Sequence, residues 1–421
     1  MLLNRASEFQ KLLDGPFRDS DGLLMMSIHE SGRALRAEDL SDADYNRPPY
    51  ANSGTTLSWH RYENTNWMMG LYLAAQAHRI IAGDPGGVES GRAMLSLLLD
   101  IYFNHTRKIE PGLLGKPIVG AGGMASYSQA NETNADQMSG ILAGLWDFYP
   151  FAAVQDRRKI EQMIVEIADY FRRRQYRMQV RGRSAEGPNH AVHASKPMLY
   201  MLMAHRFAPS AGFYDEYLRW FEMSRRDPTI NATCLSYLHW MSVCGKTRGD
   251  EEFYWAGIWN TFIDVIARLS ELDPDRRPMF RTRLRDWWDE TEPMLTEDGK
   301  VSISMMVTPE TRRWRLIKPG EIERGPYSCF WGAPVLFSGQ WAAPIAMNLL
   351  EQCPEVHQRV QPWLAKLLSK TDREALRAIS VMSGCELPRN LTGMSKQLGA
   401  PVMWIYAYWR ARANRLLSPN E

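Results

Sequence analysis

The sequence predicts an all-α fold in a single domain over residues 1–421: a closed helical toroid of the (α/α)6 type. Strongly apolar helices alternate with charged, amphipathic ones. Long polar loops separate these helix pairs, and the unit recurs roughly every 50–65 residues, a spacing seen in repeat architectures. An apolar helix suits an inner ring that is buried on both sides, and an amphipathic helix suits an outer ring with one face in water. Irregular loops and the lack of a letter-level repeat favour a closed ring over an open solenoid.

The individual elements follow from periodicity and from stop signals. Residues 1–58 comprise an N-terminal helix, which ends at Asp14-Gly15-Pro16, and an irregular lead-in that contains one short strand in DGLLMMSIHE. Residues 301–318 alternate in polarity and predict a small β-hairpin. The helices are expected, in chain order, at 67–81, 88–103, 132–149, 156–177, 190–205, 212–223, 229–244, 253–272, 281–290, 328–350, 354–368 and 402–417.

Composition narrows the class of protein. An apolar share of 45% and a charged share of 23% are ordinary for a globular enzyme, and a net charge of +2 argues against nucleic acid or an acidic membrane surface as a partner. The five cysteines form no CxxC pair, which argues against a disulfide framework and a zinc knuckle. The N-terminus lacks a signal-peptide core and no segment is apolar enough to span a membrane, so we expect a cytoplasmic protein.

The central stretch is YSQANETNADQMSGILAGLWDFYP, residues 127–150, a polar turn that leads into an apolar helix. Glu132 and Asp136 stand four residues apart and would share one side of that helix. Two carboxylates so close raise one another's pKa, so that the protonated one can serve as a general acid. Alternatively, Glu132 balances the helix dipole and Asp136 bonds a neighbouring loop.

Similar polar clusters begin the other apolar helices. If the inner helices run parallel, their starts meet on one rim of the barrel, where helix N-termini favour anionic groups. Such a meeting of carboxylates, imidazoles, amides and aromatics is typical of a catalytic pocket. The clusters contain Arg61, Glu63 and Asn64; Glu132, Asn134 and Asp136; His190 and His193; Tyr237 and His239; and Arg324 and Tyr327.

Two passages, WHRYENTNWMMGLYLAA and YSQANETNADQMSGILAGL, resemble the six-hairpin glycosidase superfamily, which includes unsaturated glucuronyl hydrolases and several polysaccharide lyases. The resemblance extends from about residue 58 onward as architecture. It implies a carbohydrate-active enzyme. In the unsaturated glucuronyl hydrolases, catalytic aspartates lie at the starts of inner helices. Asp136 matches that role, and this sequence shows no second matching aspartate.

The leading hypothesis is a glycoside hydrolase that acts on short, uronate-bearing oligosaccharides. Asp136 is the general acid or base and Glu132 or Glu63 its partner, although Glu63 also suits a helix cap. His190 and His193 bind substrate or shuttle protons; an interior role and half of a metal site are the alternatives, the last disfavoured because no HExxH occurs. The remaining candidates bind substrate: Arg61 and Arg324 through an anionic group, then Asn64, Asn134, Tyr237, His239 and, as a sugar platform, Trp331.

Two other functions stay open. A lyase would use a histidine with Tyr327 or Tyr237 to remove the proton α to a uronate carboxyl. A noncatalytic toroid would serve as a binding or scaffold protein. No GxGxxG, P-loop, nucleophile elbow or zinc motif is present, so no cofactor or metal is expected. The oligomeric state is left open.

Overall fold

The structure is a computed structural model. It describes residues 1–29, 31–39, 54–133, 135–176, 179–180, 183–184, 195–226, 238–239, 247–248, 251–256, 262–292, 295, 300–302, 304–308, 313–316, 336–338, 343–370, 394–397 and 399–418. Within these ranges the chain is dominated by helices, and the strands are short.

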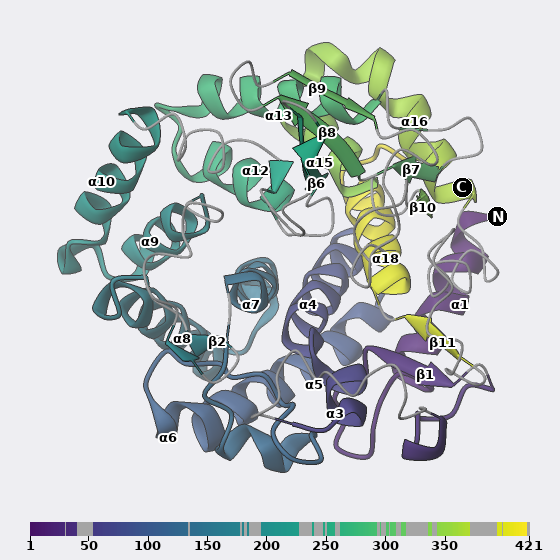
Figure 1. Ribbon diagram of the computed structural model, residues 1–421, viewed down its shortest axis with the longest axis vertical. Helices are drawn as coiled ribbons and strands as arrows, with labels where there is room; N and C mark the ends of the chain where they lie inside the picture. Colours follow the sequence, from purple (N-terminus) through teal and green to yellow (C-terminus); the bar gives the residue numbers. More distant parts are fainter. Residues whose placement is uncertain are drawn as a thin grey trace.

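Six described helices form a closed inner ring. Each contacts the next, and the last returns to the first, as Figure 1 shows in the view down the ring. This closure confirms the predicted (α/α)6-type toroid. The inner helices are α4 (Thr65–Ile81), α7 (Ala135–Phe148), α9 (Ser195–Phe207), α12 (Phe262–Leu272), α15 (Ala343–Gln352) and α18 (Gly399–Ala413).

A second ring of amphipathic helices surrounds the first. For example, α8 buries Ile160, Met163, Ile164 and Ile167 and turns its charged residues outward. The outer helices are α1 (Leu2–Asp14), α5 (Gly86–Asp100), α8 (Val154–Arg173), α10 (Phe213–Arg226), α13 (Arg277–Thr291) and α16 (His357–Lys370). α1 packs on α18, and α5 packs on α4. α8 and α10 both pack on α9, α13 packs on α12 and α15, and α16 packs on α15.

The direction of the inner helices follows from their connections. A short segment joins α4 to α5, α7 to α8, α9 to α10, α12 to α13, and α15 to α16. The C-terminal turns of α4, α7 and α12 also meet, because Asp147 contacts both His78 and Arg268, so these inner helices run in the same direction. Their N-terminal ends lie at one end of the barrel, as the sequence predicts.

Short helical turns complete the described helical structure. The helix α3 (Thr56–Tyr62) is capped at its N-terminus by Thr55, whose side chain accepts a hydrogen bond from the Ser58 amide. The other turns are η1 (Ala37–Asp39), the π-helical η2 (Ile101–Thr106), α6 (Arg107–Ile109), η3 (Met124–Ser128), η4 (Tyr149–Phe151), η5 (Pro209–Ala211) and η8 (Pro354–Val356).

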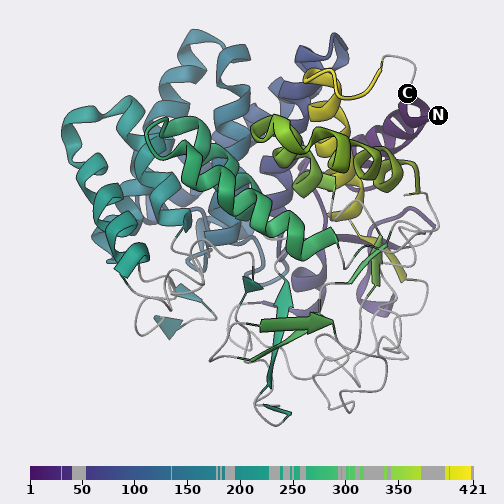
Figure 2. The same ribbon diagram turned by 90° about the horizontal axis from the view of Figure 1, so that it is seen from above.

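The β-structure gathers at one end of the helices (Figure 2). The predicted hairpin is confirmed as β8 (Ser304–Thr308) paired antiparallel with β9 (Arg313–Leu316). Three further strands extend it into a five-stranded sheet: β4 (Leu238–His239), β5 (Thr247–Arg248) and β6 (Glu251–Ala256). The other pairs are β7 (Lys300–Ser302) with β10 (Leu336–Ser338), β1 (Ser27–His29) with β11 (Met394–Gln397), and β2 (Gln179–Val180) with β3 (Arg183–Ser184).

Three helix predictions are wrong in part. The expected helix 253–272 begins at Phe262, because residues 251–256 form β6. The expected helices 229–244 and 328–350 contain the strands β4 and β10, and α15, the described helix in the second range, begins at Ala343. The segment EEFYWA in β6 combines aromatic residues that favour strands with a partner strand, β8, distant in sequence. Pairing with that strand outweighs the local helical pattern.

The tightest contact in the inner ring joins α4 to α7. A Cβ atom on Gly70 would lie 2.1 Å from the Gly140 carbonyl oxygen, and one on Gly144 would lie 2.3 Å from the Gly70 carbonyl oxygen. A Cβ atom on Gly140 would lie 2.4 Å from the indole of Trp67. These glycines therefore let the two backbones touch directly, which brings the starts of α4 and α7 together.

Candidate functional site

Several predicted site residues lie outside the part of the chain that the structure describes. Arg61, Glu63, Asn64 and Glu132 are described in full. Asp136 is placed by its backbone in the first turn of α7, and His239 by its backbone in β4; their side chains are not among those described. Asn134, His190, His193, Tyr237, Arg324, Tyr327 and Trp331 lie outside the described residues.

A buried lysine joins two of the predicted carboxylates. The Lys116 ammonium lies 3.0 Å from Oε1 of Glu63 and 3.9 Å from Oε1 of Glu132. The side chain of Lys116 is 2% exposed and that of Glu132 is 1% exposed, whereas Glu63 is 19% exposed. A lysine is rarely so buried without an anionic partner, so these three side chains form one charge cluster. Glu63 is its most accessible member.

The segment that carries Lys116 is fixed along its length. Thr133 Oγ1 donates to the Leu114 carbonyl at 2.9 Å, and Asn66 Nδ2 donates to the Gly115 carbonyl at 2.9 Å. The Lys116 amide donates to the Glu132 carbonyl at 2.7 Å, and Ser58 Oγ donates to the Ile118 carbonyl at 2.7 Å. Elements α3, α4 and the approach to α7 thus hold the lysine in place.

Gln137 of α7 ties that helix to Glu63 and Asn64. Its Nε2 donates to Asn64 Oδ1 at 2.8 Å and to the Glu63 carbonyl at 3.2 Å, while its Oε1 accepts from the Trp67 amide at 3.3 Å. One buried amide therefore sets the position of Glu63 relative to α7. Asp136 precedes Gln137 in the same turn of this helix.

Glu132 differs in position from its prediction. It lies in the extended segment before α7, which begins at Ala135, and not on the helix itself. The reason is that Glu132 and Thr133 bond across to Lys116 and Leu114 in place of starting the helix. Glu132 therefore approaches Lys116 from the buried side.

Arg61 and Tyr62 contact the N-terminal segment. The Arg61 guanidinium donates to the Leu35 carbonyl, and the Tyr62 hydroxyl donates to Asp19 Oδ2 at 2.8 Å. Burial, and then the charge of Asp19, raises the pKa of Tyr62 well above its usual range. Burial lowers the pKa of the neighbouring His60 to about 4, so its imidazole is neutral at physiological pH. These side chains anchor α3 beside the cluster.

Sequence reasoning missed Lys116 and Gln137. The lysine is a single cation within the apolar run LLGKPIV, residues 113–119, which is a signal of a buried charge with a partner elsewhere. Gln137 follows Asp136 in the stretch already singled out, and nothing in its spacing separates it from a solvent-facing residue.

A second polar group, also missed, lies near the C-terminal ends of the inner helices. Arg268 of α12 donates from both terminal nitrogens to the carboxylate of Asp147 on α7, at 2.7 Å each, and His78 Nε2 lies 3.3 Å from Asp147 Oδ2. Arg410 of α18 pairs with Glu351 of α15. The first pair links α7 and α12 across the ring, and the second links the neighbouring helices α15 and α18.

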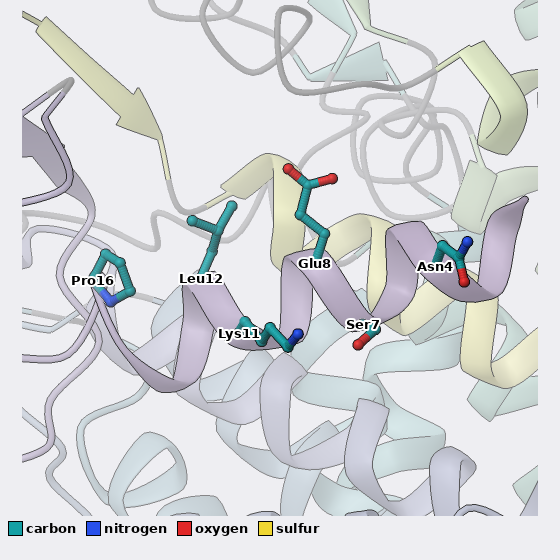
Figure 3. A pocket seen from close by; sticks show the side chains of 6 residues that line it. All are labelled: Asn4, Ser7, Glu8, Lys11, Leu12 and Pro16. Atoms are coloured by element: carbon teal, nitrogen blue, oxygen red, sulfur yellow. The ribbon is translucent and has the colours of Figure 1, made fainter.

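A hollow of about 510 Å³ lies on α1, on the outside of the barrel (Figure 3). The side chains that line it all come from one helix and the turn after it: Asn4, Ser7, Glu8, Lys11, Leu12 and Pro16. It contains none of the predicted site residues and no aromatic side chain among its lining. We therefore place the candidate site at the charge cluster.

No described helix has both the length and the apolar character that crossing a membrane requires. Within the same residues, no group of three or more His, Cys, Asp and Glu side chains is arranged to hold a metal ion.

Comparison with known proteins gives similarity in structure but not in sequence. No protein-family model matches the chain, and no curated protein matches it. A sugar epimerase from a ruminal bacterium is similar in structure with a TM-score of 0.53 and 9% identity, over 96% of this chain and 99% of that one. An unsaturated glucuronyl hydrolase specific for heparin is similar with a TM-score of 0.53 and 11% identity, over 98% of each chain. The predicted resemblance is thus confirmed at the level of the fold: the chain is a helical toroid similar in structure to these two proteins.

Proposed function

We propose that the protein is a carbohydrate-active enzyme, a glycoside hydrolase that cleaves short, uronate-bearing oligosaccharides. The observation that carries the proposal is the charge cluster of Glu63, Lys116 and Glu132 between the starts of α4 and α7. A partly exposed carboxylate held by a buried ammonium is suited to acid/base or nucleophilic chemistry. The fold, shared with a sugar epimerase and an unsaturated glucuronyl hydrolase, supports the same class of substrate.

Hydrolysis needs two carboxyl groups across the sugar, about 5–10 Å apart. In our proposal Asp136 is the general acid that protonates the leaving oxygen, and Glu63 is the carboxylate that activates water or attacks the anomeric carbon. The bond between that carbon and the leaving oxygen breaks, and water supplies the hydroxyl group and the proton. Glu132 acts through Lys116 in this scheme.

The other predicted residues keep their proposed roles around this pair. Arg61 and Arg324 bind a substrate carboxylate, and His190 and His193 bind the sugar or shuttle protons. We propose that Asn64, Asn134, Tyr237, His239 and Trp331 bind the sugar rings and hydroxyl groups, and that Tyr327 takes part in catalysis.

The test is turnover of a panel of uronate-bearing disaccharides and tetrasaccharides by the full chain. We expect new reducing ends, and we expect Glu63→Gln and Asp136→Asn each to lower kcat by about 10²–10⁴-fold, as loss of a positioned acid or base does. The matched control is Glu166→Gln, which removes an ion-paired carboxylate from outer helix α8 and should leave turnover unchanged.

The same assay separates the other classes of function. A lyase would yield a product that absorbs ultraviolet light, and an epimerase would change the stereochemistry of a sugar without cleaving it. A noncatalytic toroid would consume no sugar, and Asp136→Asn would leave its properties intact. Full turnover in both Glu63→Gln and Asp136→Asn would contradict the proposed site.

A further inference from the structure

Lys116 is a buried cation that lies near two carboxylates, those of Glu63 and Glu132. A lysine that merely neutralises a buried acid needs one partner. Lys116 lies closer to Glu63, at 3.0 Å, than to Glu132, at 3.9 Å. The shorter contact goes to the carboxylate that is the more exposed of the two, 19% against 1%.

The surroundings of Lys116 restrict its motion. Its own amide bonds the Glu132 carbonyl at 2.7 Å, its carbonyl accepts from the Ile118 amide at 2.8 Å, and the preceding Gly115 is locked against Ala130. A Cβ atom on Gly115 would lie 1.9 Å from the Ala130 carbonyl oxygen, so this packing has no room to shift. The backbone of Lys116 is therefore fixed, and its side chain, only 2% exposed, extends through the interior to the two carboxylates.

Glu63 is restrained from the opposite side. It caps the C-terminus of α3, its amide donates to the Trp59 carbonyl at 3.1 Å, and its carbonyl accepts from Gln137 Nε2 at 3.2 Å. α3 and α7 thus fix the backbone of Glu63, and the bond to Lys116 then fixes the orientation of the Glu63 carboxylate. A reacting group held in one orientation reacts faster than one that samples several.

We infer that Lys116 is a positioning residue for Glu63: its ammonium fixes the orientation of that carboxylate, and Glu132 balances the charge from the buried side. The inference rests on the proposed function, because it assigns Lys116 a role in that site. It assigns Glu132 to the lysine and leaves Glu63 as the carboxylate that faces substrate. It predicts that the lysine matters for turnover beyond its contribution to folding.

The experiment separates turnover from stability. Lys116→Met alone leaves Glu132 buried without its ammonium and is expected to unfold at a lower temperature. The double variant Lys116→Met with Glu132→Gln removes the cation and one buried charge together. We expect it to regain a Tm near that of the wild type while its kcat stays about 100-fold below wild type and its KM changes less than about threefold. Lys116→Arg, which keeps the charge, should recover part of kcat.

A matched control removes a buried ion pair from the other end of the inner helices. Arg268→Met with Asp147→Asn should keep the turnover of the wild type, because that pair lies away from the cluster. Recovery of full kcat by the double variant of Lys116 and Glu132 would overturn the inference while the proposed function stands. Unchanged turnover in Glu63→Gln would instead overturn the proposed function, and the inference with it.

Discussion

The most direct test of what holds the toroid together is removal of Arg268. This guanidinium joins α12 to α7 through two bonds of 2.7 Å to Asp147, and the two side chains are 4% and 11% exposed. Arg268→Met leaves the Asp147 carboxylate buried without its main partner. Breaking a buried pair in this way is destabilising by about 3–5 kcal/mol.

That free energy corresponds to a measurable shift in Tm. With an unfolding entropy of about 2.1 cal/mol/K per residue, the 421 residues give about 0.9 kcal/mol/K if they unfold together. A loss of about 4 kcal/mol then lowers Tm by about 4–5 °C. The double variant Arg268→Met with Asp147→Leu should unfold close to the wild type, because apolar replacement of a whole buried pair is often neutral.

The pH dependence has a definite sign. Burial alone would raise the pKa of Asp147, but Arg268 and His78 outweigh it and hold that pKa well below its usual value of 3.8. A carboxyl group whose pKa is lowered on folding stabilises the protein above pH 4, and this stabilisation is lost as the pH falls further. In Arg268→Met the raising effect of burial on the pKa of Asp147 is no longer opposed by Arg268. Protonation of Asp147 at acid pH then removes the cost of its buried charge, so the difference in stability between the variant and the wild type becomes smaller.

The assay is thermal unfolding by calorimetry at pH 7 and at about pH 4. Arg268→Met is expected to unfold below the wild type at pH 7 and nearer to it at the lower pH. A single variant with the Tm of the wild type at pH 7, or a double variant as unstable as the single one, would refute the reasoning.

Two further predictions concern packing and protonation. Gly140→Ala should destabilise the protein by about 1–3 kcal/mol or more, because the new methyl group would lie 2.6 Å from the Trp67 carbonyl oxygen, which belongs to the backbone. The control is Gly86→Ala, whose methyl group would instead meet the end of the Arg79 side chain. Equal Tm values for the two variants in calorimetry would contradict the prediction. Burial lowers the pKa of His60 to about 4, so its imidazole binds a proton less readily in the folded state than in the unfolded state. The stability of the protein should therefore fall as the pH drops from 6.5 to 4. Urea unfolding should show a loss of roughly 3 kcal/mol over that range that His60→Phe does not show.

The arrangement of helices could be predicted from the sequence because it depends on patterns that repeat along the chain. The alternation of apolar helices such as α4 with charged helices such as α8 specifies two layers. The sheet could not be predicted in full, because β6 forms through pairing with β8, some fifty residues later. Local periodicity contains no information about such a partner.

The candidate site was predicted in part for a similar reason. Glu63, Asn64 and Glu132 stand out because polar residues precede apolar helices, and the structure brings them together around Lys116 and Gln137. Lys116 comes from a loop between helices, so its place between two carboxylates depends on the folded chain. The position of Glu132 before the start of α7 likewise depends on the bonds of Glu132 and Thr133 to Lys116 and Leu114.

The first and last of the described helices pack on each other: α1 lies on α18, with Phe9 edge-on to Trp404 at 5.2 Å, while Arg5 bonds the last turn of α16. During synthesis on the ribosome, α1 therefore lacks its partner α18 until nearly four hundred further residues have been made. Until then, the apolar faces of α1 and α4 that α18 covers are open to water. Completion of this fold therefore requires that α18 has been synthesised, and the nascent chain is a candidate for chaperone binding in the interval.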